Sequence, residues 1–240
     1  MRKQQGFTLV EIAIVLVIIG LLLGGILRGQ ELIQGARVRN VIDQQNGVRA
    51  AFFAFQDRFR LIPGSIPAAQ INLVGSNALA SSAATAGNGT IATTDSTTAF
   101  QNLTATGFLS CSVCTVGSVA STSANSPSNV YGGVMQLVTD LEMANITTAV
   151  AGPTSTLTST RTNVKTGNLI PSNVMGEIDL KADDGNPFTG NVRFSRWAGS
   201  LPQLGVASCT SNANPGSTWN NGQSAAQAIS GNCGGGTIIN

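Results

Sequence analysis

Histidine is absent from this 240-residue chain, and charged side chains make up only 10% of it. Histidine is the most common general base and the most common metal ligand in proteins. Its absence excludes Ser-His-Asp and Cys-His mechanisms, and it excludes zinc sites that contain histidine. Composition leaves hydrolysis by paired carboxylates open. No convincing constellation of catalytic residues is present, so we expect that the protein is not an enzyme.

The chain also lacks a concentration of basic charge. Thirteen Lys and Arg residues stand against eleven Asp and Glu, which gives a formal net charge of +2. The basic residues are scattered, with no basic patch that has aromatics interleaved. Nucleic acid is therefore not favoured as a partner. Two stretches rich in Ser, Thr, Ala and Asn, at 77–98 and 118–130, have few large apolar residues, and we expect surface loops there.

One long apolar run stands near the N-terminus, at 7–27, where Thr8 and Glu11 are the polar side chains. About 20 apolar residues in a helix span a hydrocarbon core of roughly 30 Å. Arg2 and Lys3 precede the run, so the N-terminus is expected in the cytoplasm and the rest of the chain outside. An ordinary secretory signal differs from this run, because it has a shorter apolar stretch followed by a cleavage site with small residues.

The helical pattern continues beyond the membrane-length run, through 28–60. Apolar residues there recur every three or four positions, which predicts one apolar stripe. We expect a helix from about Phe7 to Phe59 that ends near 61–67, where Pro and Gly residues interrupt it. Such a helix of about 50 residues is about 80 Å long. The stripe implies that the C-terminal part of the chain packs on its second half.

Glu11 is unexpected inside the apolar run. A charged side chain at mid-bilayer costs roughly 2.5–3.5 kcal/mol, and such residues usually have a partner and a function. The next basic residue on the helix is Arg28, more than about four turns away. We therefore expect a partner from another chain or from an N-terminus created by cleavage. The alternative is that the side chain reaches the membrane interface, since it lies about one turn from the start of the helix.

The stretch GFTLVE at 6–11, after a short basic leader and before the apolar helix, resembles the class III signal of type IV pilins and type II secretion pseudopilins. The resemblance implies that a prepilin peptidase cuts between Gly6 and Phe7 and then N-methylates Phe7. It also implies that Glu11 pairs with the positive α-amine of Phe7 in a neighbouring subunit during assembly. Major pilins commonly have a proline late in the hydrophobic helix, where the helix loosens in the filament. This chain has no proline there, so the glycines at 24, 25 and 29 would have to allow that loosening.

The resemblance also implies an organisation. Residues 1–6 form the leader, 7–34 the transmembrane and filament-core helix, and 35–240 a globular head that includes the amphipathic half of the helix. The expected fold class is α+β, the pilin fold, in which a long N-terminal helix packs on a small C-terminal antiparallel β-sheet with long loops. Before assembly the chain would cross the inner membrane once, and afterwards it would belong to a periplasmic or extracellular filament.

Several segments downstream resemble one pilin-like group more weakly. They are a turn at 59–67, a short helix at 100–109 and an Asp-rich loop at 176–193. Apolar and polar residues alternate at 177–182 and 191–197, which predicts strands there, and four short runs in all are strand-like. These runs lie at 133–141, 173–182, 191–198 and 236–240. A small antiparallel sheet on the stripe of the long helix lets each element bury the apolar face of the other.

Four cysteines stand at 111, 114, 209 and 233, and an even number in an exported protein favours disulfides. Three pairings are open, and we favour Cys111–Cys114 with Cys209–Cys233. The second pair would close a loop of about 25 residues, worth about 3 kcal/mol, and it resembles the C-terminal disulfide-bounded loop of many pilins. The alternatives are a thioredoxin-type redox motif at 111–114 and a metal site formed by all four cysteines.

The acidic stretch DLKADDGN brings Asp179, Asp183 and Asp184 together before a Gly turn. Two interpretations are open. Asp-Gly and Asn-Pro are ordinary turn chemistry, because Asp side chains accept hydrogen bonds from nearby backbone amides. Carboxylates with loop carbonyls also suit a structural calcium ion, although the spacing is not that of an EF-hand. No other cofactor is expected, because the Gly-rich stretch at 231–237 lacks the Lys of a phosphate-binding loop.

These features favour a structural subunit of an extracytoplasmic helical filament, a type IV pilus or pseudopilus. The expected partners are identical or homologous pilin subunits, the prepilin peptidase, the inner-membrane assembly platform and the membrane itself. Two alternatives stay open. One is a minor pilin that acts as an adhesin or binds a surface or DNA through loops at 75–130 or 205–235. The other is a type II secretion pseudopilin involved in protein export.

Overall fold

The computed structural model describes residues 9–75, 77–82, 86–143, 159–197, 206–211, 218–222 and 229–239. The chain divides into two compact units, 1–39 and 40–240, and the first helix contributes to both. The sequence predicts a globular head that begins at residue 35, within the same helix. Unit 40–240 holds all the strands and shorter helices described, and the long helix enters it through its last 20 residues.

The long helix α1 comprises Leu9–Phe59, 51 residues, and its end at Phe59 confirms the sequence prediction. Arg60 follows with φ 57°, the left-handed conformation that commonly terminates helices, and its amide donates to the carbonyl of Gln56 at 2.9 Å. Pro63 and Gly64 come next. A Cβ on Gly64 would approach Ala99 to 2.8 Å, so the turn after α1 packs tightly on a later helix.

Three short helices follow α1. They are the 3-10 helix η1 (Ala68–Gln70) and the α-helices α2 (Ile71–Val74) and α3 (Asp95–Ala105). The sequence placed a short helix at 100–109; the structure begins it five residues earlier and ends it four residues earlier. The difference arises because the first turn of α3 is polar, Asp-Ser-Thr-Thr, and gives no apolar signal.

The polar first turn of α3 also corrects the prediction that 77–98 is a surface loop. Asp95 is fully buried there. Its Oδ2 accepts a hydrogen bond from the Ser82 hydroxyl at 2.7 Å, and its Oδ1 accepts one from the Ser118 hydroxyl at 3.0 Å. Small polar side chains can be buried when they satisfy one another in this way. Ser121 and Ser126 are likewise buried in the second expected loop, 118–130.

The predicted small antiparallel sheet is confirmed. Four strands pair in the order β1-β2-β6-β3, all antiparallel. Leu137 pairs with Val164, and Val164 pairs with Thr237 in the next strand. A separate two-stranded ribbon joins β4 and β5. The strands are β1 (Gln136–Asp140), β2 (Arg161–Lys165), β3 (Val192–Phe194), β4 (Thr210–Ser211), β5 (Thr218–Trp219) and β6 (Gly235–Ile238).

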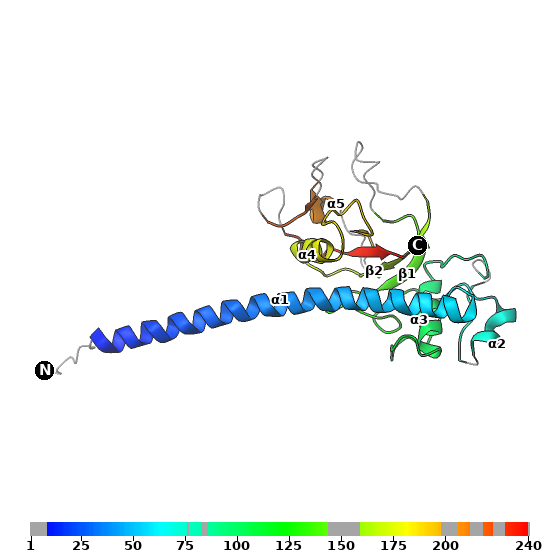
Figure 1. The fold of residues 1–240 in the computed structure, drawn as a ribbon, viewed down its shortest axis with the longest axis horizontal. Coiled ribbons are helices and arrows are strands. Elements are labelled where there is room, and N and C mark those ends of the chain that lie inside the picture. The colour runs from blue at the N-terminus through cyan, green and yellow to red at the C-terminus, as the bar shows by residue number, and fades with distance from the viewer. Residues whose placement is uncertain are drawn as a thin grey trace. The chain divides into compact units, whose positions relative to one another are not determined.

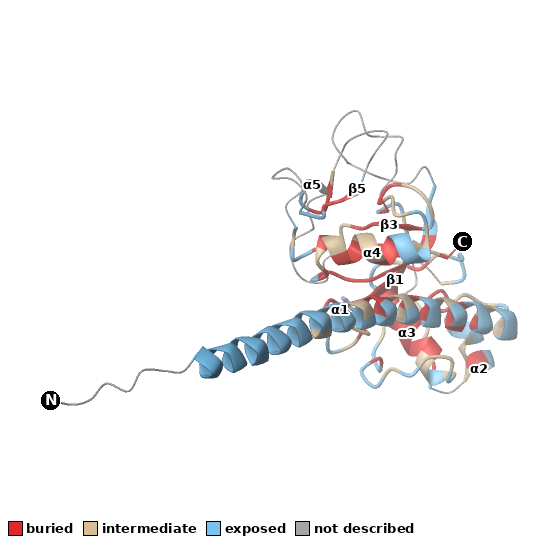
Figure 2. Ribbon diagram, turned by 60° about the vertical axis from the view of Figure 1, so that its left-hand side comes forward, coloured by how far each residue is buried: buried red, intermediate tan, exposed pale blue. Residues whose placement is uncertain are grey.

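The core lies between the sheet and the later turns of α1, as predicted from the apolar stripe. Phe52 and Phe55 of α1 are fully buried in one cluster with Leu137 and Val164 of the sheet. The Thr237 hydroxyl of β6 donates to the side-chain oxygen of Gln45 on α1. Both views show β1 beside this part of α1 (Figures 1 and 2). The stripe and the sheet thus cover each other.

One predicted strand is wrong, since residues 173–182 lie in the α-helix α4 (Ser172–Ala182). The alternation prediction placed Ile178 and Leu180 on the same face of a strand. In the structure Ile178 is 2% exposed and Leu180 is 70% exposed. Val174, Met175 and Ile178 are buried together, a spacing of one, three and four that belongs to a helix. The short apolar run carried both patterns, and packing selected the helical one.

Strand β2 was missed because it is largely polar. Its sequence is RTNVK, and Lys165 at its end is 1% exposed. The Lys165 ammonium donates to Asp140 of β1 and to Glu142 at 3.0 Å, so its charge is paired inside the protein. A buried ion pair between neighbouring strands leaves no apolar alternation for sequence reasoning to detect.

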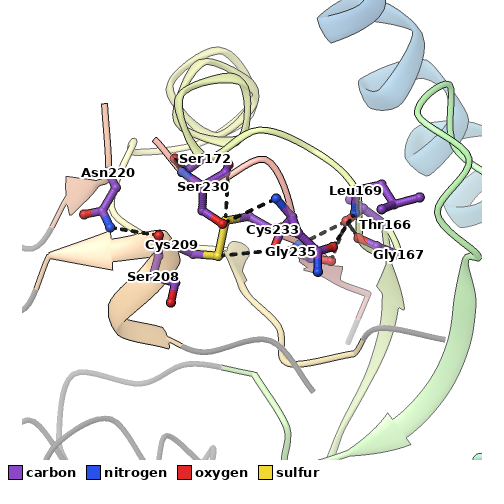
Figure 3. The surroundings of a disulfide bond; sticks show 11 residues. Thr166, Gly167, Leu169, Ser172, Ser208, Cys209, Asn220, Ser230, Cys233 and Gly235 are labelled. Carbon is purple, nitrogen blue, oxygen red and sulfur yellow. Dashed lines mark hydrogen bonds between the residues drawn. A yellow bond between two sulfur atoms is a disulfide. The ribbon is translucent and has the colours of Figure 1, made fainter. Parts of the chain in front are cut away.

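The four cysteines form two disulfides, Cys111–Cys114 and Cys209–Cys233, which is the favoured pairing. Cys209 is the last residue of the short helix α5 (Val206–Cys209), and Cys233 lies just before β6. Figure 3 shows this second disulfide beside the first turn of α4, where the Ser172 hydroxyl accepts from the amide of Ser230 at 3.1 Å. The two disulfides therefore cross-link loops, and the four cysteines do not form one metal site.

Candidate assembly helix and acidic loop

The three aspartates of the acidic stretch come from one helix and the loop that follows it. Asp179 lies on the last turns of α4, Asp183 directly follows the helix, and Asp184 comes next. The structure brings one carboxylate oxygen of each within 4.8 Å of the others. The expected convergence of these side chains is therefore present.

The loop carboxylates organise the backbone. Asp183 Oδ2 accepts hydrogen bonds from the amides of Asn191 and Val192, the second at 2.9 Å. Asp184 accepts from the Asn186 amide at 2.9 Å and from the Thr189 hydroxyl at 2.5 Å. This is the turn chemistry that Asp residues provide, and it shapes the connection from α4 to β3.

Gly190 is required by the same loop. Its φ is +65°, and a Cβ there would overlap Asp183 Oδ2. No side chain fits between this backbone and the carboxylate. The loop is thus wound closely around the Asp183 carboxylate.

Asp179 differs from the other two because it is fully buried. Its Oδ2 accepts a hydrogen bond from the indole Nε1 of Trp219 at 2.8 Å, while its Oδ1 has no hydrogen-bond partner. The pKa of Asp179 is raised to about 6, chiefly by burial and in addition by the neighbouring carboxylates of Asp184 and Asp183. Hydrogen bonds donated by the Trp219 indole and by the Gly185 backbone amide lower this pKa without offsetting burial.

Sequence reasoning missed two residues at this site, Trp219 and Arg193. Trp219 comes from β5, 40 residues after Asp179, and reaches it through the fold. Arg193 of β3 lies close to the aspartates; burial lowers its pKa, while Asp184 and Asp183 oppose that shift. Only the alternation in β3, which points Arg193 away from the buried Val192 and Phe194, hinted at the position of Arg193.

The first half of α1 is an apolar surface. An 18-residue window of α1 has a mean hydropathy of 2.8, and none of its residues is buried. By length and composition α1 is able to cross a membrane. Figure 2 shows the early turns of α1 exposed on the sides in view, in contrast with the buried positions on its later turns. A continuous exposed surface of this kind marks a site of membrane or protein contact.

Glu11 stands in the first turn of α1 and is exposed among apolar neighbours such as Leu9 and Ile12. A carboxylate is favourable near a helix N-terminus, because it faces the positive end of the helix dipole. The predicted processing positions, Gly6 and Phe7, lie outside the described residues. The side chain that the sequence assigned to assembly is therefore on the exposed apolar helix.

Glycines interrupt this apolar surface without any local need for them. At Gly20, Gly24, Gly25 and Gly29 a Cβ would meet nothing within 4 Å. Each glycine in a helix interior costs up to about 1 kcal/mol relative to alanine. Small residues on an apolar helix let another helix approach closely, so these positions fit contacts made outside the single chain.

The comparison with known families settles what this N-terminal region is. Residues 1–27 match the family model described as the prokaryotic N-terminal methylation motif. The chain carries a prepilin signal. Comparison with curated proteins and with solved structures gave no significant match.

The prepilin signal covers the leader, the predicted cleavage junction, Glu11 and most of the apolar half of α1. Together with the long helix and the small antiparallel sheet, it supports a protein like the type IV pilins and pseudopilins. An N-terminal apolar helix behind such a signal fits a membrane-anchored precursor.

Proposed function

We propose that this chain is a structural subunit of an extracytoplasmic helical filament, a type IV pilus or a pseudopilus. The observation that carries the proposal is the prepilin signal at 1–27, which overlaps a helix whose first half presents a fully exposed apolar surface. In a precursor that surface is covered by lipid, and in a filament it is covered by the same helix of neighbouring subunits. The function is assembly, and we do not assign catalysis to any residue.

Processing is the first step of the proposed mechanism. A prepilin peptidase cuts after Gly6 and methylates the new N-terminus at Phe7. Removal of 1–6 also removes Arg2 and Lys3, the charges that hold the N-terminus in the cytoplasm. The mature chain then begins with a positive α-amine four residues before Glu11.

Assembly follows from two properties of the mature helix. Glu11 of an incoming subunit pairs with the α-amine of a neighbour, which neutralises two charges that are costly in hydrocarbon. The contact is heterologous, since one subunit gives its N-terminus and the other its carboxylate, and such contacts propagate into a helical filament instead of closing. The inner-membrane platform is the expected place of addition.

Co-expression with a prepilin peptidase tests the processing step. We expect intact mass spectrometry of the membrane fraction to show a chain that lacks residues 1–6 and carries one methyl group on Phe7. A Gly6→Asp chain is the matched control and is expected to stay at full length. A wild-type chain that is left uncleaved by an active peptidase, or cut at another bond, would contradict the proposed processing.

A further inference from the structure

The two disulfides differ in how far a reagent can reach them. Cys209 and Cys233 are both fully buried. In the other pair, Cys114 is buried in the same apolar cluster as Phe55, whereas Cys111 is only partly buried. Thiol–disulfide exchange begins when a thiolate contacts one of the two sulfur atoms, so access controls its rate. The Cys111–Cys114 bond therefore has one reachable end, and the Cys209–Cys233 bond is enclosed.

A cleft leads to Cys111. Its volume is about 360 Å³, and it lies between α1 and the segment that carries the disulfide. Gly47 and Val48 of α1 line one side, and residues 109–113 line the other. A Cβ on Gly47 would meet nothing within 4 Å, so the α1 side of the cleft is open. Its volume falls in the range of small-molecule sites, and a small dithiol can therefore enter it.

The segment that carries this disulfide is attached to α3 at both ends. Before it, the Leu109 amide donates to the carbonyl of Leu103 at 3.1 Å. After it, the Ser118 amide donates to the Thr98 hydroxyl at 2.8 Å. Residues 110–116 in between form no helix or strand. Breaking the disulfide would thus release a short segment between two points that stay attached, and the head would remain folded.

The lengths of the two closed loops support different roles for the disulfides. The sequence separation is 3 for Cys111–Cys114 and 24 for Cys209–Cys233. In the chain-entropy model, a disulfide stabilises the folded chain more when it closes a longer loop. The long loop makes Cys209–Cys233 the main structural cross-link. The short pair adds less stability, in a segment that α3 already holds.

We propose that Cys111–Cys114 is a thiol–disulfide exchange site that accepts two electrons from an external dithiol, while Cys209–Cys233 stays oxidised. One thiolate of the dithiol attacks Cys111 Sγ through the cleft, and the bond between the two cysteines breaks. Cys114 leaves as a thiolate and takes up a proton. The second thiolate of the dithiol then displaces Cys111, which is also protonated. Two cysteine thiols and one reagent disulfide result, so two electrons and two protons have passed to the protein.

Reduction would alter one surface of the head. Residues 110–113 line the cleft, so their release changes its wall beside Gly47 and Val48. The Cys114 thiol can stay in the apolar cluster, because free cysteine behaves as a small hydrophobic residue. The pair is thus a redox-sensitive element of the head surface, and it does not depend on filament assembly.

Timed reduction of the full-length chain in detergent tests the proposal. The chain is incubated with dithiothreitol in mildly alkaline buffer, quenched with acid, unfolded and alkylated, and the cysteine peptides are quantified by mass spectrometry. The Cys114 thiolate forms in an apolar cluster, which is costly, so reduction is expected to take minutes to hours. Cys209–Cys233 is expected to react at least about tenfold more slowly, because its region must first open. Equal rates, or earlier loss of Cys209–Cys233, would overturn the proposal.

Two single variants test the point of attack. Cys114→Ser leaves the Cys111 thiol free, and Cys111→Ser leaves the Cys114 thiol free. The Cys111 thiol lines the cleft and the Cys114 thiol is buried. Dithiobis-nitrobenzoate, which releases a coloured thiolate, is therefore expected to react at least about tenfold faster with Cys111. Equal or faster reaction of Cys114 would contradict attack at Cys111.

Two double variants compare the structural weight of the disulfides. Cys111→Ser with Cys114→Ser is expected to lower the denaturant midpoint of the full chain about half as much as Cys209→Ser with Cys233→Ser. The difference follows from the lengths of the two closed loops. A larger loss for the first pair would contradict the inference that α3 holds 110–116 in the reduced chain.

Discussion

A Glu11→Ala chain is expected to be cleaved and methylated normally but to reach sheared filaments at about a tenth of the wild-type amount or less. Without Glu11, the α-amine of the neighbouring subunit stays charged and unpaired in an apolar environment, which costs several kcal/mol. A loss of only about 1.4 kcal/mol per contact already gives a tenfold effect. The ratio of chain in the sheared fraction to chain in the membrane, determined by immunoblot, measures this.

Glu31→Ala is the matched control for Glu11→Ala. Glu31 lies on the same helix, and its exposed side chain pairs with Arg28 at 2.5 Å. Exposed ion pairs of this kind contribute about 0–1 kcal/mol, so incorporation is expected to change less than about twofold. Normal incorporation of Glu11→Ala, or an equal defect in Glu31→Ala, would contradict the role assigned to Glu11.

Phe55→Ala is expected to lower the free energy of unfolding of the head by about 3–5 kcal/mol, the usual cost of removing a buried Phe. The Phe55 side chain is fully buried, and its ring centroid lies 4.8 Å from that of Phe59 and 6.3 Å from that of Phe108. The deletion therefore leaves a cavity where the stripe of α1 meets the core. Denaturant unfolding of the full chain in detergent, followed by tryptophan fluorescence, measures the loss.

Phe53 provides the comparison two residues away. It is 41% exposed on the opposite side of α1, with Arg49 5.9 Å from its ring centroid. Phe53→Ala is expected to cost about 1 kcal/mol or less, because it removes an exposed ring and a weak cation–π contact. Equal losses for the two variants would contradict the assignment of one buried stripe to the later half of α1.

The long helix could be predicted almost completely from sequence. Its apolar run, the spacing of its stripe and the Pro and Gly residues after it are all local signals, and the helix ends at Phe59 as expected. The strand at 192–194 also carried enough alternation to be found, and the strand before the C-terminus overlaps the short strand-like run at 236–240. Local patterns of this kind survive without knowledge of the fold.

At 173–182 the short apolar run fitted both a helix and a strand, and only packing separates the two. The other errors lie where polar groups are buried. Strand β2 was missed because Lys165 is buried by an ion pair with Asp140. Asp95 was assigned to a loop because only the folded chain brings Ser82 and Ser118 to it. Sequence reasoning underestimates such positions, since their partners come from distant segments.

The two candidate sites also differ in how far the sequence alone could identify them. The prepilin motif is a contiguous stretch, so Gly6, Phe7 and Glu11 could be named directly from sequence. The acidic stretch could be named too, but its two interpretations could not be separated. The full burial of Asp179 and its contact with Trp219 depend on α4 and β5 meeting in space, and that information is not local.

The most direct test of the filament proposal is mass spectrometry of filaments sheared from cells that produce this chain. We predict that the filaments contain the chain, that its first residue is Phe7, and that this residue carries one N-methyl group. A chain that is produced and cleaved but stays entirely in the membrane or periplasm, and is absent from every sheared or pelleted filament, would contradict the account.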